Sequence, residues 1–178
     1  MRHIKMTGET IYLTPLILDD AEVITGWYNN PEVTQYLSAH REVRSLETVK
    51  EEVEKRIKTG AAFAIFCKET DRLIGFIVLD GDYIEVLVGE TEYRTDDFYM
   101  EAVNFLLDYG FNIKNCNILS VSAYSHDEAA LALYEKLGLR KAVVKRERLL
   151  RGRNKYDEVY FDMLASEYFQ RGKNDAEL

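Results

Sequence analysis

The chain has 178 residues, 47% of them hydrophobic and 30% charged, with a formal net charge of −8 at pH 7. This length and composition predict one soluble globular domain that buries a sizeable core without disulfides or metals. The acidic balance excludes a general binder of nucleic acids or of anionic membranes. No apolar run approaches a membrane span and the N-terminus lacks the apolar region of a signal peptide, so we expect a cytoplasmic protein.

The first elements predicted along the chain are a strand and a helix. Residues 10–16 have the composition of a strand. Residues 19–30 are predicted to form a helix, because Asp19 and Glu22 have capping-box spacing and a proline follows the segment. A turn or short helix is expected at 31–37.

An amphipathic helix is predicted at 45–60. A serine can cap its start, a glycine can end it, and one apolar stripe runs along it, made of Leu46, Val49, Val53 and Ile57. Three strands follow, and connections of two or three residues between them imply antiparallel hairpins. These strands are expected at 61–69, 72–79 and 83–89.

A parallel crossover is predicted in the middle of the chain. The segment from about residue 96 to residue 112 is apolar on most sides, which indicates a helix buried against a sheet. Strands 84–89 and 117–124 flank this helix. Because a helix joins them, the two strands must run parallel.

A helix with clear start and stop signals is predicted at 125–139. Ser125 and Glu128 have capping-box spacing, and Gly138 stands where a left-handed residue ends a helix, with Leu139 next to it. Two long strands are expected after it, at 141–150 and 154–164. A short helix follows them, and residues 170–178 are expected to form a frayed tail. The whole order predicts a mixed α/β (α+β) domain whose sheet is mostly antiparallel, with one parallel pair splayed at one end and helices on both faces.

The stretch "RKAVVKRERLLRGRNK" (140–155) stands out because it holds eight basic residues and one acidic residue. A basic patch of this kind can face an anionic ligand. A solvated hairpin is the alternative, and we favour it because Gly152 lies at a plausible turn and apolar positions alternate on both sides.

This order of elements, together with "NILSVSAYSHDEAALALYEKLGL" (117–139), resembles the GNAT superfamily of acyl-CoA N-acyltransferases. Within it, the chain is most similar to the branch that includes ribosomal-protein N-terminal acetyltransferases. The resemblance extends from "GETIYLTPL" to "DEVYFDML", and "ALYEKLGL" is its most specific piece. It implies a single GNAT domain over residues 1–178, acetyl-CoA as cofactor, a primary amine of a small molecule, an amino sugar or a peptide N-terminus as acceptor, and a homodimer.

The resemblance also implies where acetyl-CoA binds. In the family the pantetheine pairs with the fourth strand, and a Q/R-x-x-G-x-G/A turn holds the pyrophosphate at the next helix N-terminus. Arg94 matches the first position of that turn, whereas Asp97 and Tyr99 stand in place of the two glycines. A family asparagine corresponds to Asp127. The implied cofactor-binding residues are Val86, Leu87, Val88, Arg94, Thr95, Asp96, Asp97, Phe98, Tyr99 and Asp127.

Catalytic roles are implied for two residues. Tyr134, in "ALYEKLGL", corresponds to the family tyrosine that protonates the leaving thiolate, although a tyrosine on such a helix can equally be core. Glu85 is a candidate general base on the strand beside which the amine would lie, and its alternative is a solvent-facing carboxylate. The early helices line the acceptor pocket in this family, which makes candidates of Trp27, Tyr28 and Tyr36.

The altered turn leaves two interpretations open. Asp96 and Asp97 can substitute for the phosphate at the helix N-terminus, which makes the chain a catalytically weak or inactive binding or regulatory protein. Alternatively, CoA binds in another pose and basic residues such as Arg94, Arg140 and Lys141 supply the attraction.

Histidine and cysteine show no spacing for metal, triad or redox chemistry. Cys67 and Cys116 are expected to be buried thiols. We therefore expect no metal, and we expect no catalytic role for His3, His40 or His126.

Overall fold

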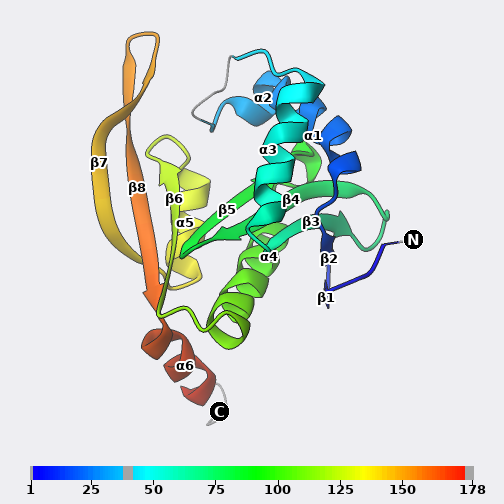
Figure 1. Cartoon of the computed structure of the whole chain (residues 1–178). Coiled ribbons are helices and arrows are strands. Elements are labelled where there is room, and N and C mark those ends of the chain that lie inside the picture. The colour runs from blue at the N-terminus through cyan, green and yellow to red at the C-terminus, as the bar shows by residue number, and fades with distance from the viewer. Residues whose placement is uncertain (1, 38–41, 175–178) are drawn as a thin grey trace. The chain divides into compact units, whose positions relative to one another are not determined.

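The structure is a computed structural model that describes residues 2–37 and 42–174, with side chains as far as Arg171. His40 lies outside these residues. The strands follow the order β1-β2-β3-β4-β5-β6-β8-β7 in one mostly antiparallel sheet (Figure 1). The chain divides into two compact units, one made of residues 1–81 and 85–106 and the other of residues 82–84 and 107–178. Each unit is described by itself.

The first unit contains the N-terminal strands and helices. Its strands are β1 (Met6–Thr7), β2 (Ile11–Pro15), β3 (Ala62–Cys67), β4 (Leu73–Asp80) and most of β5 (Tyr83–Val88). Its helices are α1 (Ala21–Tyr28), α2 (Pro31–Thr34), α3 (Leu46–Lys58) and most of α4 (Asp96–Asp108). Strands β2 and β3 pair antiparallel, as do β3 and β4. The predicted elements are confirmed within a few residues, and only the short β1 was not expected.

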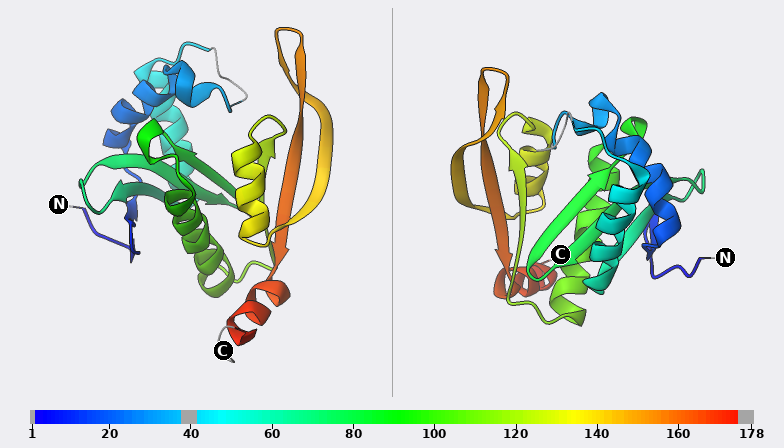
Figure 2. Two further views of the ribbon diagram at one scale, coloured as in Figure 1. Left: turned by 180° about the vertical axis from the view of Figure 1, so that it is seen from behind. Right: turned by 45° about the horizontal axis from the view of Figure 1, so that its top comes forward.

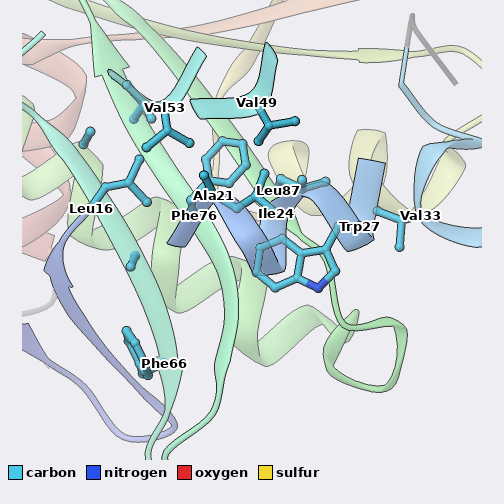
Figure 3. Packing of buried hydrophobic residues seen from close by; sticks show 13 residues of the cluster. Leu16, Ala21, Ile24, Trp27, Val33, Val49, Val53, Phe66, Phe76 and Leu87 are labelled. Atoms are coloured by element: carbon cyan, nitrogen blue, oxygen red, sulfur yellow. The ribbon is translucent and has the colours of Figure 1, made fainter. Parts of the chain in front are cut away.

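Helices cover both faces of the first unit's strands. Alternate residues of β3 face opposite sides, and Ala62, Ala64 and Phe66 contribute to a core cluster with α1 and α3 (Figure 3). Helix α4 covers the other face, with Ala102 and Val103 fully buried (Figures 1 and 2). Of the stripe predicted for α3, Val49 and Val53 are fully buried, whereas Leu46 and Ile57 are exposed at 38% and 36%.

The start of α1 differs from the prediction. A 3-10 turn, Leu18–Asp20, precedes the helix, and buried Asp20 accepts a hydrogen bond from the Ile17 N–H at 3.0 Å. The Asp20 carboxylate also pairs with Arg2. The capping-box pair predicted at Asp19 is therefore wrong, because its neighbour Asp20 faces the core side and makes these bonds.

The second unit contains β6 (Ile118–Tyr124), α5 (Glu128–Lys136), β7 (Arg140–Arg151), β8 (Asn154–Leu164) and α6 (Ala165–Asn174), together with Asp82–Ile84 of β5. A π-helical segment, Tyr109–Ile113, extends α4 into this unit. Strands β5 and β6 pair in parallel with Tyr83 opposite Ser120, which confirms the predicted crossover. Helix α6 includes residues 170–174 of the segment predicted to fray, and residues 175–178 lie outside the described residues.

The ends of α5 show one confirmed and one wrong prediction. At its C-terminus Gly138 has φ 70°, and the Leu139 N–H donates to the Tyr134 carbonyl at 3.0 Å, as the sequence predicts. At its N-terminus the capping residue is Asp127, which accepts from the Ala130 N–H at 3.2 Å. Ser125 instead accepts from the Asp157 N–H of β8, so the predicted start is three residues early.

Strands β7 and β8 form one long antiparallel hairpin around Gly152, which has φ 61° (Figure 2). The hairpin interpretation of the basic stretch is therefore confirmed. Cys67 is buried as expected, but Cys116 is only half-buried, because it follows the π-helical segment at a chain bend. Within the described ranges, no helix is long and apolar enough to cross a membrane.

Candidate functional site

An ion-pair network in the first unit surrounds the candidate base Glu85. The Arg56 guanidinium, from α3, donates to both Glu85 oxygens, from Nε to Oε2 at 3.0 Å and from Nη2 to Oε1 at 2.6 Å. Arg56 Nη2 also donates to the Tyr28 hydroxyl of α1 at 3.0 Å, and the guanidinium lies 4.9 Å from the centre of the Phe76 ring. Three elements far apart in sequence therefore place one cation against one carboxylate.

A second layer of charges supports this pair. Glu52 lies 3.6 Å from Arg56 Nη1 and forms a short ion pair with Arg44. Arg44 in turn lies 5.8 Å from the centre of the Tyr28 ring. Glu52 thus approaches Arg56 at Nη1, the guanidinium nitrogen that does not bond to Glu85.

The pKa shifts in this network define its protonation. Burial raises the pKa of Tyr28 to about 12, so its hydroxyl keeps its proton at neutral pH. Burial alone would lower the pKa of Arg56. The hydrogen bonds to Glu85 and the electrostatic interactions with Tyr28, Glu85 and Glu52 together outweigh burial and raise this pKa, so Arg56 is charged. Glu85 is half-exposed, with 39% of its side chain accessible, and both oxygens are engaged. It is neither an isolated base nor a freely solvated carboxylate.

The loop between β5 and α4 carries the expected CoA-binding residues of this unit. Leu87 and Val88 are buried at the end of β5, whereas Val86 is half-buried. A 3-10 turn, Thr91–Tyr93, leads to Arg94 and Thr95, and the Thr95 carbonyl accepts the N–H of Tyr99 at 3.3 Å. Helix α4 therefore begins directly after Thr95, as the sequence predicts.

The first turn of α4 is acidic and open. Asp96 and Asp97 are exposed, and Phe98 and Tyr99 are half-buried. The first N–H groups of any helix have no partner within the helix, so this turn has the geometry of an anion site. Two carboxylates stand beside it, and Arg94 lies with its guanidinium 4.5 Å from the centre of the Tyr36 ring.

A glutamate that the sequence did not single out anchors this loop. Glu90 accepts from Trp27 Nε1 at 2.9 Å and from Arg72 at 2.9 Å, and Arg72 also pairs with Glu92. Trp27 is buried, and a Cβ added to Gly89 would lie 1.9 Å from its ring. Trp27 is thus a core residue that contacts this loop, and the pocket-lining role expected for it stays a prediction.

The second unit contains Tyr134 and Asp127, both on α5. Tyr134 is 3% exposed, and its ring centre lies 5.7 Å from that of Phe161 in β8. Asp127 caps the helix, a role that an asparagine at this position also fills. His126 precedes the cap with its ring centre 4.2 Å from that of Tyr156, and Arg151 Nη1 lies 3.4 Å from His126 Nε2.

The structure thus brings Glu85 together with Tyr28, and Arg94 with Tyr36, in the first unit. Tyr134 and Asp127 belong to the second unit. Arg56 and Glu90 were missed, because nothing local distinguishes them from the neighbouring charged residues. In the part of the chain that the structure describes, no group of three or more His, Cys, Asp or Glu side chains is placed to hold a metal ion.

Residues 10–140 match the acetyltransferase (GNAT) domain family model. An uncharacterized N-acetyltransferase, p20, from Bacillus licheniformis is 28% identical over 171 residues, which cover 90% of this chain and 96% of that protein. These matches confirm the family predicted from the sequence.

Solved structures share the fold over nearly the whole chain. Spermidine N-acetyltransferase from Vibrio cholerae, in complex with CoA and spermine, has a TM-score of 0.78 and 21% identity, covering 91% of this chain and 99% of that one. RimL, a ribosomal L7/L12 alpha-N-protein acetyltransferase in complex with CoA, has a TM-score of 0.76 and 13% identity, covering 91% and 98%. The predicted mixed α/β GNAT fold is therefore confirmed.

Proposed function

Because the chain belongs to the GNAT acetyltransferase family, we propose that it transfers an acetyl group from acetyl-CoA to a primary amine of a small molecule or a peptide N-terminus. The family match over residues 10–140 is the observation that carries this proposal. CoA appears in the solved structures of similar fold, and the amine acceptors in their names belong to those proteins. A cytoplasmic location and a homodimer remain part of the proposal.

The candidate cofactor-binding and catalytic residues have distinct roles in the proposed reaction. The backbone of Val86–Val88 and the first turn of α4 would hold acetyl-CoA, whose thioester supplies the activated acetyl group. Tyr134 would donate its hydroxyl proton to the departing sulfur. Glu85, oriented by Arg56, would accept a proton from the acceptor ammonium directly or through water.

The fit of acetyl-CoA to the α4 turn is mixed. The exposed first turn offers N–H groups and the positive end of the helix dipole, which suit a diphosphate. Asp96 and Asp97 oppose it, because a unit pair of like charges at about 4 Å costs roughly 1 kcal/mol in water and roughly 4 at an effective dielectric of 20. Arg94 is the one cation within the turn itself.

Calorimetric titration of the full chain with acetyl-CoA, followed by detection of released thiol with a panel of amines, tests the proposal. Micromolar binding with thiol release is the expected result. Absence of binding at millimolar acetyl-CoA would remove the proposal in its ordinary form.

A binding or regulatory protein of the GNAT fold is the second candidate. Asp97 and Tyr99 favour it, because glycine at these positions lets the backbone approach a pyrophosphate closely. This candidate predicts neither thiol release nor tight CoA binding in the same titration.

Replacing both Asp97 and Tyr99 by glycine is expected to tighten CoA binding about tenfold. The change removes one charge and one ring, and about 1.4 kcal/mol of relief corresponds to a tenfold lower dissociation constant. The same change costs stability, up to about 1 kcal/mol per glycine. Calorimetry at low and high salt measures the affinities.

Asp96→Asn is the matched control for the double glycine variant. It keeps the size of the side chain and removes its charge, so its smaller benefit should shrink as salt rises. If the double variant stays folded and binds CoA no better than the parent, the carboxylates do not block a phosphate site.

Replacing Glu85 by glutamine is expected to lower kcat/KM for the amine roughly 100-fold, because general base catalysis contributes about 10²–10⁴. The affinity for acetyl-CoA should not change, since the substitution leaves the α4 turn intact. Rates measured from pH 6 to pH 9 with an acceptor of known pKa provide the readout.

Glu54→Gln is the control for Glu85→Gln. Glu54 is an exposed carboxylate on α3, and among the ion pairs of the described residues it pairs only with Lys58, at 3.7 Å. Equal rates for Glu85→Gln and the parent at every pH would show that Glu85 only anchors Arg56.

A further inference from the structure

Strand β7 lacks cover on both faces over most of its length, although Leu149 near its end is buried. Nine consecutive residues, Arg140–Arg148, are exposed, whereas most strands of the chain alternate or are buried. β7 is the last strand of the sheet and pairs with β8 along one edge. A strand whose second edge and both faces are open is a template for pairing with another chain.

The charge of this strand is opposite to that of the rest of the chain. Residues 140–155 carry eight basic residues and one acidic residue, and the remaining residues carry 15 basic and 30 acidic. Arg140, Arg148 and Lys155 form ion pairs with Glu167, Glu158 and Glu147. Four further exposed cations take part in none of the ion pairs found among the described residues. Of these, Lys145 donates to the Tyr160 hydroxyl at 2.9 Å, and the other three are Lys141, Arg146 and Arg153.

Apolar side chains lie between these cations. Val143 and Val144 are exposed at 53% and 39%, and Leu150 at 64%. Exposed β-branched residues in a strand are suited to contact the side chains of an added strand. The surface therefore combines an open backbone edge, apolar positions and charges of one sign.

A second copy of β7 does not fit this edge. Antiparallel pairing of β7 with itself sets a strand with six cations and one anion against the same strand, and like charges opposite each other destabilise a pair. Nucleic acid fits poorly as well. The nine exposed residues include no aromatic side chain for base stacking, and the acidic remainder of the chain repels phosphates.

We propose that β7 is a docking strand for an acidic, extended segment of a partner protein. The segment adds to the open edge of β7 through backbone hydrogen bonds, as in other strand additions. Lys141 and Arg146 of β7, and Arg153 in the turn directly after it, attract the carboxylates of the segment. Val143 and Val144 contact its apolar residues. This inference goes beyond acetyl transfer and does not depend on it.

Fluorescence anisotropy with the full chain tests the proposal. The probe is a labelled peptide of alternating Glu and Val that matches the length of β7, 12 residues. A lysine-for-glutamate version, a version with two prolines and a single-stranded DNA of equal length serve as comparisons. The acidic peptide is expected to bind, with an affinity that falls as salt rises. The proline version is expected to bind at least tenfold more weakly, because proline removes backbone donors.

Charge-reversing variants identify the surface. The triple change Lys141→Glu, Arg146→Glu and Arg153→Glu should weaken binding of the acidic peptide at least tenfold. A triple change with the same total charge at other exposed sites should weaken it less than twofold; it consists of Lys5→Glu, Lys50→Glu and Lys55→Glu. If the first triple variant melts abnormally, the corresponding glutamine variants take its place.

Three results would overturn the proposal. One is equal binding of the acidic and the proline-containing peptides, which would leave only unspecific charge attraction. Another is DNA binding as tight as peptide binding. The third is a dimer, seen by sedimentation, that the β7 triple variant dissociates, because a second copy would then occupy the strand.

Discussion

Replacing Glu101 by alanine is expected to lower the free energy of unfolding by about 3 kcal/mol. The Glu101 carboxylate, on α4, accepts hydrogen bonds from the backbone N–H groups of Glu9, Thr10 and Ile11, and from the Thr10 hydroxyl. A Cβ added to Gly8 would overlap the carboxylate, so the turn is fitted closely around it. Donors left without this acceptor cost roughly 1–3 kcal/mol each when buried, and water compensates in part at this half-buried site.

Urea unfolding of Glu101→Ala and the parent measures this difference. Glu51→Ala is the matched control, because Glu51 is an exposed glutamate on α3 and its loss should change stability by less than about 0.5 kcal/mol. Similar midpoints for Glu101→Ala and Glu51→Ala would show that the turn of residues 8–11 holds its place without the carboxylate.

The same contact makes part of the stability pH-dependent. Burial alone would raise the pKa of Glu101, but hydrogen bonds from Thr10 and the two neighbouring N–H groups outweigh it, so this pKa lies below its ordinary value of 4.5. A carboxyl with a depressed folded-state pKa stabilises the fold above the unfolded pKa and loses this contribution as pH falls through the folded pKa. The stability difference between the parent and Glu101→Gln should therefore be largest at neutral pH and shrink below about pH 4.5.

The sequence predicted correctly those helix ends, turns and strand pairings that depend on residues close together in the chain. The left-handed Gly138 and the apolar residue after it ended α5 where the sequence placed the end. The parallel β5–β6 pair followed from the helix between the two strands, because such a connection has few geometric solutions. The hairpin at Gly152 followed from a turn residue between two alternating segments.

Contacts between distant residues were not predictable in the same way. Arg56 is one of three basic residues in the last turn of α3. Only its contacts with distant residues distinguish it, such as Glu85, 29 residues away, and Tyr28, 28 residues away. Glu101 bonds to a turn about 90 residues earlier. Asp20 bonds to the Ile17 N–H before α1, and Asp127 bonds to the Ala130 N–H of α5. The local pattern did not distinguish these two carboxylates from the nearby Asp19 and Ser125.

The catalytic role predicted for Tyr134 from the sequence remains a proposal. By the family motif, Tyr134 is the residue that donates a proton to the leaving thiolate. In the structure this tyrosine is buried and lies against Phe161 in the second unit. A buried tyrosine fits a core role as well as a catalytic one, because both require the ring to be packed. Only a substitution that keeps the ring separates the two roles.

Tyr134→Phe is therefore expected to lower kcat about 100-fold, within the roughly 10²–10⁴ that a positioned acid contributes. The dissociation constant for acetyl-CoA should change less than about twofold, because an acid that acts late affects the chemical step and not ground-state binding. Stopped-flow detection of released thiol gives the rate, and calorimetry gives the affinity.

Tyr168→Phe is the matched control, since it removes the same atom from a tyrosine of the same unit. The Tyr168 hydroxyl donates to Asp108 at 3.0 Å, and burial, together with this bond, raises its pKa to about 12, which suits a structural role. Loss of this bond should cost about 1 kcal/mol of stability and leave kcat unchanged. If Tyr134→Phe and Tyr168→Phe both turn over at the parent rate, Tyr134 is only a core residue and the proton for the thiolate comes from another group or from water. If both rates fall together with thermal stability, the loss reports on folding, and the assignment of Tyr134 as the acid is wrong.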